Sequence, residues 1–312
     1  MDLEQRILKL VSSNNSYIHD DCAYLGKSHQ LISTDTLVEN VHFNLKHFDA
    51  SKIAHRLFLC NYSDIQSSGG YPEYALLNIS FPSKNFELTQ QIIKSFKKFL
   101  AKHNIKLIGG DTTSSSRIYL SSTFISKSIK KSEIKNRRNA KVGDSIYTFK
   151  NIGFSKLGYL SIFKKQNLNK NLLIKSKNQF LKPKIITYSN LFNRCNINSC
   201  MDISDSLYCS LKELSKQSKK RFFIDSLKDV SPLLLKNLDS DNYFSSVLSS
   251  GEEYVPVFTG KLTKQDIKLF KLNRIHVIKI GTVQKGQGVV FSELENFRNY
   301  TFSHFKNTYL NL

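Results

Sequence analysis

Seven aspartates of this sequence stand out by position, because most of them lie at the ends of apolar segments or in turns beside Gly, Ser or Thr. They are Asp20, Asp21, Asp35, Asp64, Asp111, Asp202 and Asp205. If these carboxylates gather in one cleft, they repel one another strongly unless a cation neutralises them. Divalent cations that prefer oxygen ligands can do this, above all Mg²⁺ holding a polyphosphate. The pattern therefore favours metal-dependent phosphate chemistry, provided that the acids converge in space.

The segment from Leu107 to Thr113 shows this pattern most clearly. Its apolar start predicts a strand that enters a core. Gly109 and Gly110 then allow the backbone to approach a ligand without interference from Cβ atoms. Asp111 follows where we expect the strand to end and a loop to begin, a common place for chemistry. A purely structural turn explains Gly-Gly-Asp equally well, so the interpretation depends on the recurrence of the pattern along the chain.

The familiar nucleotide motifs are absent. Gly26-Lys27-Ser28 resembles the end of a P-loop, but Asp21 occupies the position of its first glycine. Gly286-Gln287-Gly288 lacks the third glycine of a dinucleotide fingerprint, and the His-Arg-Asp and Asp-Phe-Gly kinase signatures do not occur. A nucleotide enzyme with this sequence would use acids and metals in place of a lysine loop.

The charge of the chain leaves a second class of function open. The formal net charge of +21 over 312 residues suits a nucleic-acid-binding protein. However, lysines occur along nearly the whole chain, and the closest approach to a cluster, residues 127–141, also fits a solvated linker. Small anionic substrates would suit the same surface, so we consider a nucleic-acid partner the less favoured alternative.

Targeting and redox features indicate a cytoplasmic protein. No apolar run approaches the roughly 18 residues that a membrane span needs. Acidic residues at Asp2 and Glu4 stand where a signal peptide would be basic. The five cysteines form no Cys-x-x-Cys pair and no zinc-site spacing, so we expect reduced thiols.

Strands and helices alternate in both halves of the chain, which predicts two α+β domains. The predicted strands are 30–36 continuing to 43, 74–81, the segment ending at Gly109, 118–126, 145–149, 254–258 and 276–281. The predicted helices are 3–11, 51–67 with Ser51 as N-cap, 88–103, 154–163, 185–192, one from Leu207 and one after Thr263. Residues 164–178 are expected to be a loop or a fraying helix. The basic segment 127–141 is the expected boundary, giving domains 1–138 and 139–312.

Within the predicted helix 51–67, Asn61, Asp64 and the following Ser68 recur at helical spacing and so share one face.

The order and spacing of eight short motifs add a further observation. They are His19-Asp-Asp-Cys-Ala, Ile32-Ser-Thr-Asp-Thr-Leu-Val-Glu-Asn-Val-His-Phe, Asn61-Tyr-Ser-Asp-Ile, Pro72-Glu-Tyr-Ala-Leu-Leu, Leu107-Ile-Gly-Gly-Asp-Thr-Thr, Ala140-Lys-Val-Gly-Asp, Met201-Asp-Ile-Ser-Asp and Ser250-Gly-Glu-Glu-Tyr. In this order they resemble the thiamine-monophosphate kinase family, within the aminoimidazole-ribonucleotide-synthetase-like superfamily. The resemblance runs from residue 19 to the C-terminus.

The resemblance implies an α+β fold of two domains, each with a mixed sheet flanked by helices. It implies transfer of the γ-phosphoryl group of ATP to thiamine monophosphate, which gives thiamine diphosphate and ADP with the help of several Mg²⁺ ions. It also implies a homodimer formed through the N-terminal domains. No membrane partner is expected.

The resemblance also implies roles for individual residues, carried over motif by motif. The implied magnesium ligands are Asp21, Ser33, Thr34, Asp35, Asp64, Asp111, Asp202 and Asp205. Asp35, Asp111 and Asp205 are the implied catalytic residues, and the implied ATP contacts are Gly110, Asp111, Arg137 and Ser204. His42, Glu252 and Phe302 are the implied substrate contacts, although His42 and Phe302 alone would be interpreted as half-buried core residues.

The chain departs from the family pattern at several positions. The family usually has Gly at the positions of His19, Ser206 and Ser250, Asp at the position of Glu253, a basic residue at the position of Ser114 and an acid in the turn at Gly153-Phe154-Ser155. Lost glycines threaten a close backbone approach or a turn with positive φ. These departures concern turnover rate and nucleotide affinity more than the fold. Three alternatives remain open for the chain as a whole: another ATP-dependent enzyme of the superfamily, the nucleic-acid-binding protein, or a catalytically silent relative.

Overall fold

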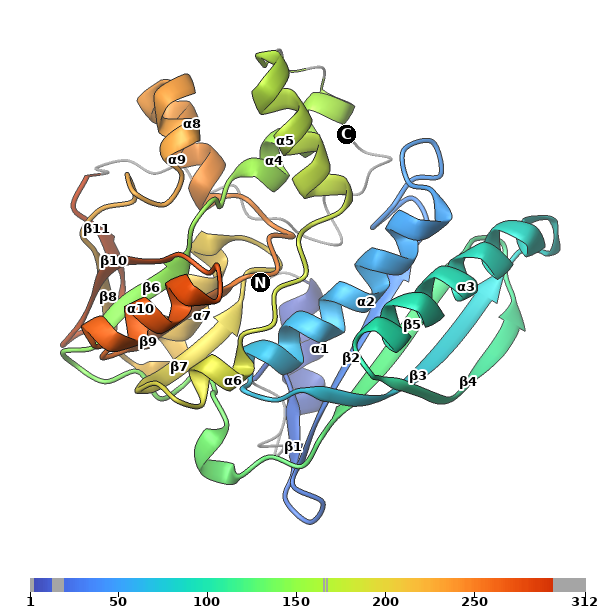
Figure 1. The fold of residues 1–312 in the computed structure, drawn as a ribbon, viewed down its shortest axis with the longest axis horizontal. Coiled ribbons are helices and arrows are strands. Elements are labelled where there is room, and N and C mark those ends of the chain that lie inside the picture. The colour runs from blue at the N-terminus through green and yellow to red at the C-terminus, as the bar shows by residue number, and fades with distance from the viewer. Residues whose placement is uncertain (1–2, 13–19, 165, 167, 294–312) are drawn as a thin grey trace. The chain divides into compact units, whose positions relative to one another are not determined.

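The computed structural model describes residues 3–12, 20–164, 166 and 168–293, and these separate into two compact units. One unit contains the described residues up to 66 together with 70–132, and the other contains 67–69 and 133–293. Each unit has a mixed β-sheet with helices packed against it, which confirms the predicted α+β class (Figure 1). The division falls between Ser132 and Glu133, whereas the sequence predicts a boundary after residue 138.

The first unit consists of one sheet and its helices. Its elements are α1 (Leu3–Ser12), β1 (Ala23–Leu25), β2 (Gln30–Val38), α2 (Ala50–Ser67), β3 (Pro72–Phe81), the 3-10 turn η1 (Ser83–Asn85), α3 (Phe86–Lys102), β4 (Lys106–Ser114) and β5 (Tyr119–Ser126). The strand order is β1-β2-β5-β3-β4, in which β3 and β4 pair in parallel and the other neighbours pair antiparallel. The helix α3 makes the crossover that a parallel pair requires.

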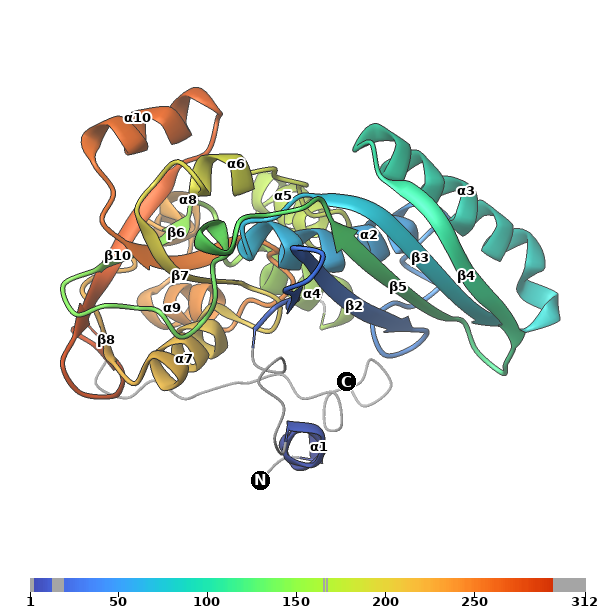
Figure 2. The same ribbon diagram turned by 90° about the horizontal axis from the view of Figure 1, so that it is seen from below.

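Helices α2 and α3 cover one face of this sheet (Figure 2). Aromatic side chains join the layers: the rings of Phe58 on α2 and Phe96 on α3 lie 5.6 and 6.3 Å from the ring of Phe124 on β5. All three side chains are buried. Burial of such rings is the main source of stability for a layer of this kind.

The other face of the same sheet carries small polar side chains. Thr34 and Thr36 on β2 pair with Thr123 and Ser121 on β5, and residues paired in this way lie on the same face. All four are exposed or half-buried, while the alternate residues Ser33 and Leu37 are buried. Residues 39–43, predicted to continue β2, instead form a turn in which Asn40 has φ 63° and its N–H donates to Phe43 O at 2.7 Å.

Strand β4 differs from its prediction in two respects. It lies at the edge of the sheet, with Leu107 and Ile108 exposed, and it continues through Asp111 to Ser114. The predicted loop start at Asp111 is therefore wrong. The glycines that suggested a loop instead allow close pairing with β3: at Gly110, φ is +152° and an added Cβ would lie 1.8 Å from Leu77 O.

Helix α2 begins one residue earlier than predicted, and its cap is a different residue. Asp49 accepts a hydrogen bond from Lys52 N at 2.9 Å, while Ser51 lies within the first turn. A carboxylate at the N-cap satisfies a free N–H and also favours the positive end of the helix dipole. This replaces the predicted cap at Ser51.

The second unit has a sheet of strand order β11-β8-β10-β6-β9-β7, in which β11 and β8 pair in parallel and the other neighbours pair antiparallel. Its strands are β6 (Ser145–Phe149), β7 (Ile197–Asp202), β8 (Arg221–Ile224), β9 (Pro256–Gly260), β10 (Val277–Gln284) and β11 (Gly288–Phe291). Its helices are α4 (Phe154–Phe163), α5 (Lys170–Leu181), α6 (Ser189–Phe192), α7 (Leu207–Ser218), α8 (Pro232–Asn237), α9 (Ser240–Leu248) and α10 (Lys264–Leu272). The 3-10 turn η2 (Lys131–Glu133) contains the division between the two units. Helices α7 and α10 lie on opposite faces of the sheet (Figure 2).

Two predictions for the second unit need correction. Most of the segment 164–178, predicted as a loop or fraying helix, belongs to the regular helix α5, which runs from Lys170 to Leu181. Asn169 caps this helix, and its residues Leu172 and Phe180 are buried. The helix predicted over 185–192 is only the short α6, since residues 183–187 contain Pro183 and have no regular structure.

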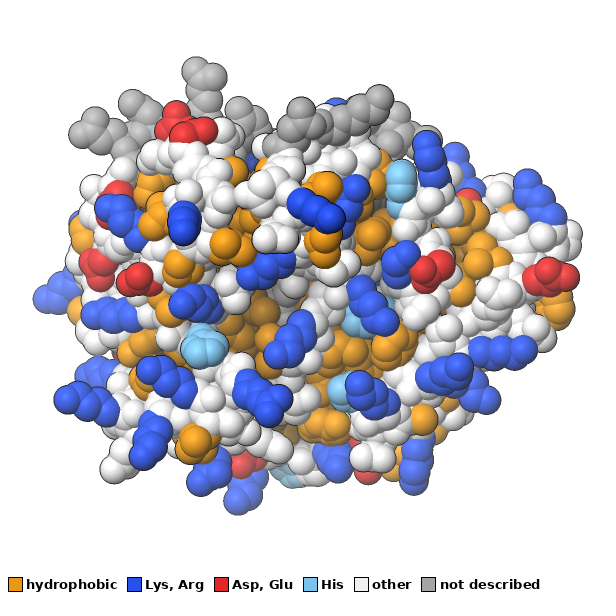
Figure 3. Space-filling model, turned by 45° about the horizontal axis from the view of Figure 1, so that its top comes forward, with side chains coloured by type: hydrophobic (Ala, Val, Ile, Leu, Met, Phe, Trp, Pro, Cys, Tyr) orange, Lys and Arg blue, Asp and Glu red, His pale blue; other side chains and the backbone are white. Residues whose placement is uncertain are grey.

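Within the described residues, no helix is both long and apolar enough to span a membrane. Lysines and arginines dominate the charged side chains on the face shown in Figure 3, and they are scattered over it rather than gathered over one element. This distribution matches the spread of lysine along the sequence.

Candidate active site

The first group of predicted metal ligands surrounds Asp64 on α2. Carboxylate oxygens of Asp21, which precedes β1, and Asp64 lie within 4.8 Å of each other. Both side chains are half-buried. Two carboxylates at this separation repel each other, and water screens that repulsion less where they are partly buried. The pair therefore fits a cation that binds oxygen atoms.

Ser33 and Asn61 hold the carboxylate of Asp64. The buried Ser33 Oγ lies 2.6 Å from Asp64 Oδ2 and 3.0 Å from Asn61 Oδ1, and the ionised carboxylate is the stronger acceptor for its single proton. Asn61 Nδ2 in turn donates to Ser122 Oγ on β5 at 2.9 Å. The predicted polar face of α2 is confirmed for Asn61 and Asp64, which both face Ser33.

Asp35 lies on the same face of β2 as Ser33, two residues along the strand. The thiol of Cys60 on α2 lies near both Asp35 and Asp64. Burial raises the pKa of Cys60 well above its usual value, and the charges of Asp35 and Asp64 raise it further. Cys60 is therefore a protonated thiol beside an acidic site, a role that its sequence position did not reveal.

Thr34 lies on the opposite face of β2 from these acids. Its Oγ1 is 2.9 Å from Thr123 Oγ1 on the polar face of the sheet. The structure thus brings together Asp21, Ser33, Asp35 and Asp64, but it does not add the side chain of Thr34 to them.

Asp111 also lies away from this group. Register pairs Thr36 with Ser121, Ser121 with Asn78 and Asn78 with Asp111, so Asp111 is three strands from β2 and on the polar face. Three strand spacings amount to about 14 Å. Asp111 is exposed, and its Oδ1 accepts the N–H of Thr112 at 2.8 Å. Within one copy, Asp35 and Asp111 therefore cannot bind the same ion.

His42 follows β2 in the turn at 39–43. Its Nδ1 accepts the N–H of Val38 at 2.9 Å, so the neutral ring carries its proton on Nε2. Arg56 Nη1 donates to the carbonyl oxygen of His42 at 2.6 Å and fixes its backbone. His42 is thus held by two hydrogen bonds, one to its ring and one to its carbonyl oxygen.

The remaining described site residues belong to the second unit. Asp202 ends β7 and is 2% exposed, whereas Ser204 and Asp205 are exposed in the turn before α7. Ser206, at a family glycine position, has extended backbone and caps α7 by accepting the N–H of Cys209 at 3.1 Å. The substitution of that glycine therefore strengthens the helix start and introduces no strain.

Glu252 lies directly against this turn. Its N–H donates to Ser204 O at 2.5 Å, and an added Cβ at Gly251 would lie 2.4 Å from Asp205 O. Glu252 itself has φ +54°, an uncommon conformation for a residue with a side chain. The second unit thus brings Ser204, Asp205 and Glu252 together.

Arg137 is at the other end of α7. Its carbonyl oxygen accepts a hydrogen bond from Ser218 Oγ at 3.0 Å, and Ser218 is the last residue of that helix. The length of α7 puts the backbone of Arg137 about 17 Å from the turn at Ser204. Phe302 and His19 lie outside the described residues, and Ser114 is the exposed last residue of β4.

The chain is similar to known proteins over most of its length. The family described as "AIR synthase related protein, N-terminal domain" matches residues 19–127. The thiamine-monophosphate kinase of Buchnera aphidicola subsp. Schizaphis graminum is 34% identical over 288 residues, which cover 88% of this chain and 86% of that protein. That of Leptospira interrogans is 29% identical over 311 residues, with 97% of each chain covered.

Solved structures show the same fold. The structure entitled "AaThiL complexed with AMPPCP and TMP" superposes with a TM-score of 0.80 at 22% identity, covering 95% of this chain and 97% of the other. The thiamine monophosphate kinase of Aquifex aeolicus gives a TM-score of 0.77, also at 22% identity, over 93% and 95% of the two chains. A hydrogenase maturation protein HypE in complex with ATP gives 0.63 at 15% identity, over 92% and 90%.

Proposed function

Since the chain belongs to the thiamine-monophosphate kinase family, we propose that it transfers the γ-phosphoryl group of ATP to thiamine monophosphate and releases thiamine diphosphate and ADP. The observation that carries this proposal is the acidic group of Asp21, Asp35 and Asp64 on the first unit. Two half-buried carboxylates within 4.8 Å of each other repel, and a bound divalent cation would relieve that repulsion.

The donor set fits Mg²⁺. The group offers carboxylate oxygens, and these supply the negative charge that a hard divalent cation prefers. Asp21, Asp35 and Asp64 would hold such ions, with Ser33 fixing Asp64. Bound Mg²⁺ would neutralise phosphate oxygens and so bring two polyanions together.

The residues of the chain have mainly to position the substrates. The acceptor is a phosphate monoester whose second pKa is about 6, so it is ionised at neutral pH and needs no strong general base. Alignment of donor and acceptor can supply roughly 7–11 kcal/mol of the barrier. We assign the Nε2–H of His42 as a donor to the acceptor substrate, and the Glu252 carboxylate as the partner of its amino or cationic groups.

We further propose that the second unit supplies the remaining ligands and nucleotide contacts. Asp202 and Asp205 would bind Mg²⁺, and Ser204 with Arg137 would contact ATP. The exposed Ser204 and Asp205 at the start of α7 support this role, because helix N-terminal N–H groups attract phosphates. Because the Arg137 backbone lies far from this turn, only its extended side chain could contact the ATP.

The position of Asp111 argues for a homodimer. Because Asp111 and Asp35 lie three strands apart on opposite faces of one sheet, we propose that Gly110 and Asp111 join the acidic group of a second copy. Thr34 could then serve as a ligand only through its backbone oxygen.

The experiment is a phosphoryl-transfer assay with purified protein, Mg²⁺ and ATP, with thiamine monophosphate or free thiamine as acceptor. We expect thiamine diphosphate from the monophosphate and no product from free thiamine, because the acceptor must itself be a metal-binding phosphate. A chelator should abolish the reaction, and Mg²⁺ should restore it. Absence of product with every divalent ion would refute the proposal and leave the silent relative.

A further inference from the structure

Glu253, the neighbour of Glu252, is a buried carboxylate with an unusually complete set of donors. It is 2% exposed. Its Oε1 accepts from Gly153 N at 2.7 Å, Ser250 Oγ at 2.6 Å and Ser155 N at 3.3 Å, and its Oε2 accepts from Gln179 Nε2 at 3.1 Å. Burial raises the pKa of Glu253, but every partner donates, so the site is built for the ionised form.

These donors come from three separate elements. Gly153 and Ser155 belong to the start of α4, Gln179 belongs to α5, and Ser250 lies in the same loop as Glu253. Ser250 Oγ also accepts the N–H of Lys156 at 3.0 Å, so it uses both its donor and its acceptor capacity. One carboxylate therefore fastens the loop at 249–254 to two helices.

The same loop carries Glu252 in its strained conformation. A φ of +54° costs free energy that the surroundings must offset. On one side of Glu252, its own N–H and Gly251 are held against Ser204 and Asp205. On the other side, the next residue is Glu253, which its own donors hold in place. Helix α4 also carries Tyr159 near Glu252: burial raises the pKa of the Tyr159 hydroxyl, and the charge of Glu252 raises it further.

Two departures from the family pattern meet in this network. The chain has Ser250 where the family usually has Gly, and Glu253 where it usually has Asp. The hydroxyl of Ser250 donates to the carboxylate of Glu253 at 2.6 Å. The two substitutions thus satisfy each other, which explains how the chain tolerates both.

From these contacts we propose that Glu253 is a positioning residue, which holds Glu252 in the geometry that binds the acceptor substrate. This inference rests on the proposed function, since it assumes that Glu252 contacts thiamine monophosphate. It goes beyond that function because it assigns the affinity for the acceptor to a buried residue that touches no substrate. Gln179 and Ser250 act in the same network.

The test is the Glu253→Gln variant. Its amide nitrogen would face the Gln179 donor, so at least one hydrogen bond is lost and the loop relaxes. We expect the KM for thiamine monophosphate to rise about tenfold or more, while the KM for ATP and kcat change less than about threefold. The double variant with Gln179→Leu should be no worse than Glu253→Gln alone, because both changes break one network.

Asp144 provides the matched control. It is a fully buried carboxylate of the same unit that accepts from Lys141 N and Asn198 Nδ2, both at 2.9 Å. We expect Asp144→Asn to lower Tm without changing the KM for thiamine monophosphate. If Glu253→Gln also lowers only Tm, Glu253 is merely structural and the inference is wrong.

If Glu253→Gln does not fold, the Gln179→Leu variant alone tests the inference. It removes only the 3.1 Å bond to Oε2 and should raise the KM for thiamine monophosphate about threefold. An unchanged KM would overturn the inference. A wild-type protein that forms no thiamine diphosphate would instead refute the proposed function, so the two failures are distinguishable.

Discussion

Asp64 is the residue around which the acidic group of the first unit is arranged. It lies close to the charge of Asp21, and Ser33 donates to it at 2.6 Å. In the metal-free protein this arrangement is unfavourable, because two half-buried carboxylates repel each other. A bound cation attracts both carboxylates, so the same pair then stabilises the folded protein.

We therefore expect Asp64→Asn to reduce turnover by about a hundredfold or more, while the metal-free Tm stays the same or rises. Mg²⁺ should raise the Tm of the wild-type protein and raise that of the variant much less, because ligands stabilise only what binds them. Scanning calorimetry with and without Mg²⁺ measures both effects. The exposed Asp241→Asn variant is the control and should behave as wild type. Unfolding of Asp64→Asn would mean that this acid is structural.

At the scale of elements, the pairing of β3 with β4 depends on Gly110. An added Cβ would lie 1.8 Å from Leu77 O, closer than any real contact. We expect Gly110→Ala to destabilise the protein by about 3 kcal/mol or more, because the strand pair must separate locally. Gly26→Ala, with nothing within 4 Å, should change stability by less than about 0.5 kcal/mol. Urea unfolding tests both, and equal effects would contradict the assigned strand pairing.

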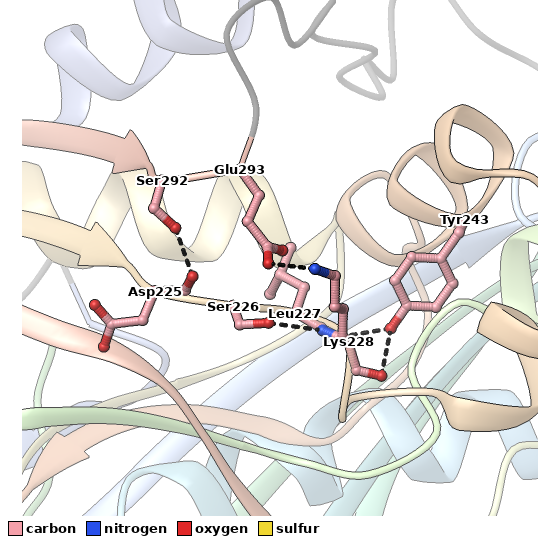
Figure 4. Close-up of polar contacts among 7 residues, drawn as sticks. All are labelled: Asp225, Ser226, Leu227, Lys228, Tyr243, Ser292 and Glu293. Atoms are coloured by element: carbon pink, nitrogen blue, oxygen red, sulfur yellow. Dashed lines mark hydrogen bonds and ion pairs between the residues drawn. The ribbon is translucent and has the colours of Figure 1, made fainter.

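A second prediction at this scale concerns Tyr243, which ties α9 to the segment after β8 (Figure 4). Its hydroxyl donates to Leu227 O at 2.5 Å. Glu293, two residues after β11, joins the same segment through an ion pair with Lys228 at 2.8 Å. Loss of the buried hydroxyl in Tyr243→Phe should cost about 1–2 kcal/mol at pH 7, measured by urea unfolding.

The pH dependence of this contact has a definite sign. Burial raises the pKa of Tyr243 from 10.0 to about 12. Between these values the unfolded chain loses the proton first, so this residue contributes a fall in stability as pH rises from 10 to 12 and none below. Tyr243→Phe should therefore lose less stability over that range than the wild-type protein. An equal loss in both proteins would show that the hydroxyl is not buried.

At the scale of the whole molecule, the position of Asp111 makes a prediction about assembly. If a second copy contributes Asp111, then Asp35→Asn and Asp111→Asn are each inactive alone. A mixed dimer of the two variants has one intact site out of two. Random exchange of subunits should therefore restore about a quarter of the wild-type activity, because half of the dimers are mixed.

The control for this experiment is a mixture of Asp35→Asn with Asp64→Asn. Both residues lie in the acidic group of one copy, so no mixed dimer contains an intact site. Activity in neither mixture would mean that each chain builds its site alone, and would contradict the proposed dimer.

The sequence by itself determined the family, the α+β class and the identity of most chemical groups. Motif order and apolar periodicity are properties of the sequence itself, so they can be recognised without knowledge of the tertiary structure. The same is true of the shared face of Asn61 and Asp64, which follows from helical spacing. The prediction that β4 ends before Asp111 was wrong because a glycine pair, which is typical of a turn, also permits close strand pairing.

Only the tertiary structure decided which groups meet. Ser33 reaches Asp64 because the strand order places β2 under α2, and Asp111 is separated from Asp35 because β5 and β3 lie between their strands. Glu253 collects donors from α4 and α5, some 100 and 74 positions away in sequence. Strand order, register and helix packing are set by burial over the whole chain, and no local pattern contains them.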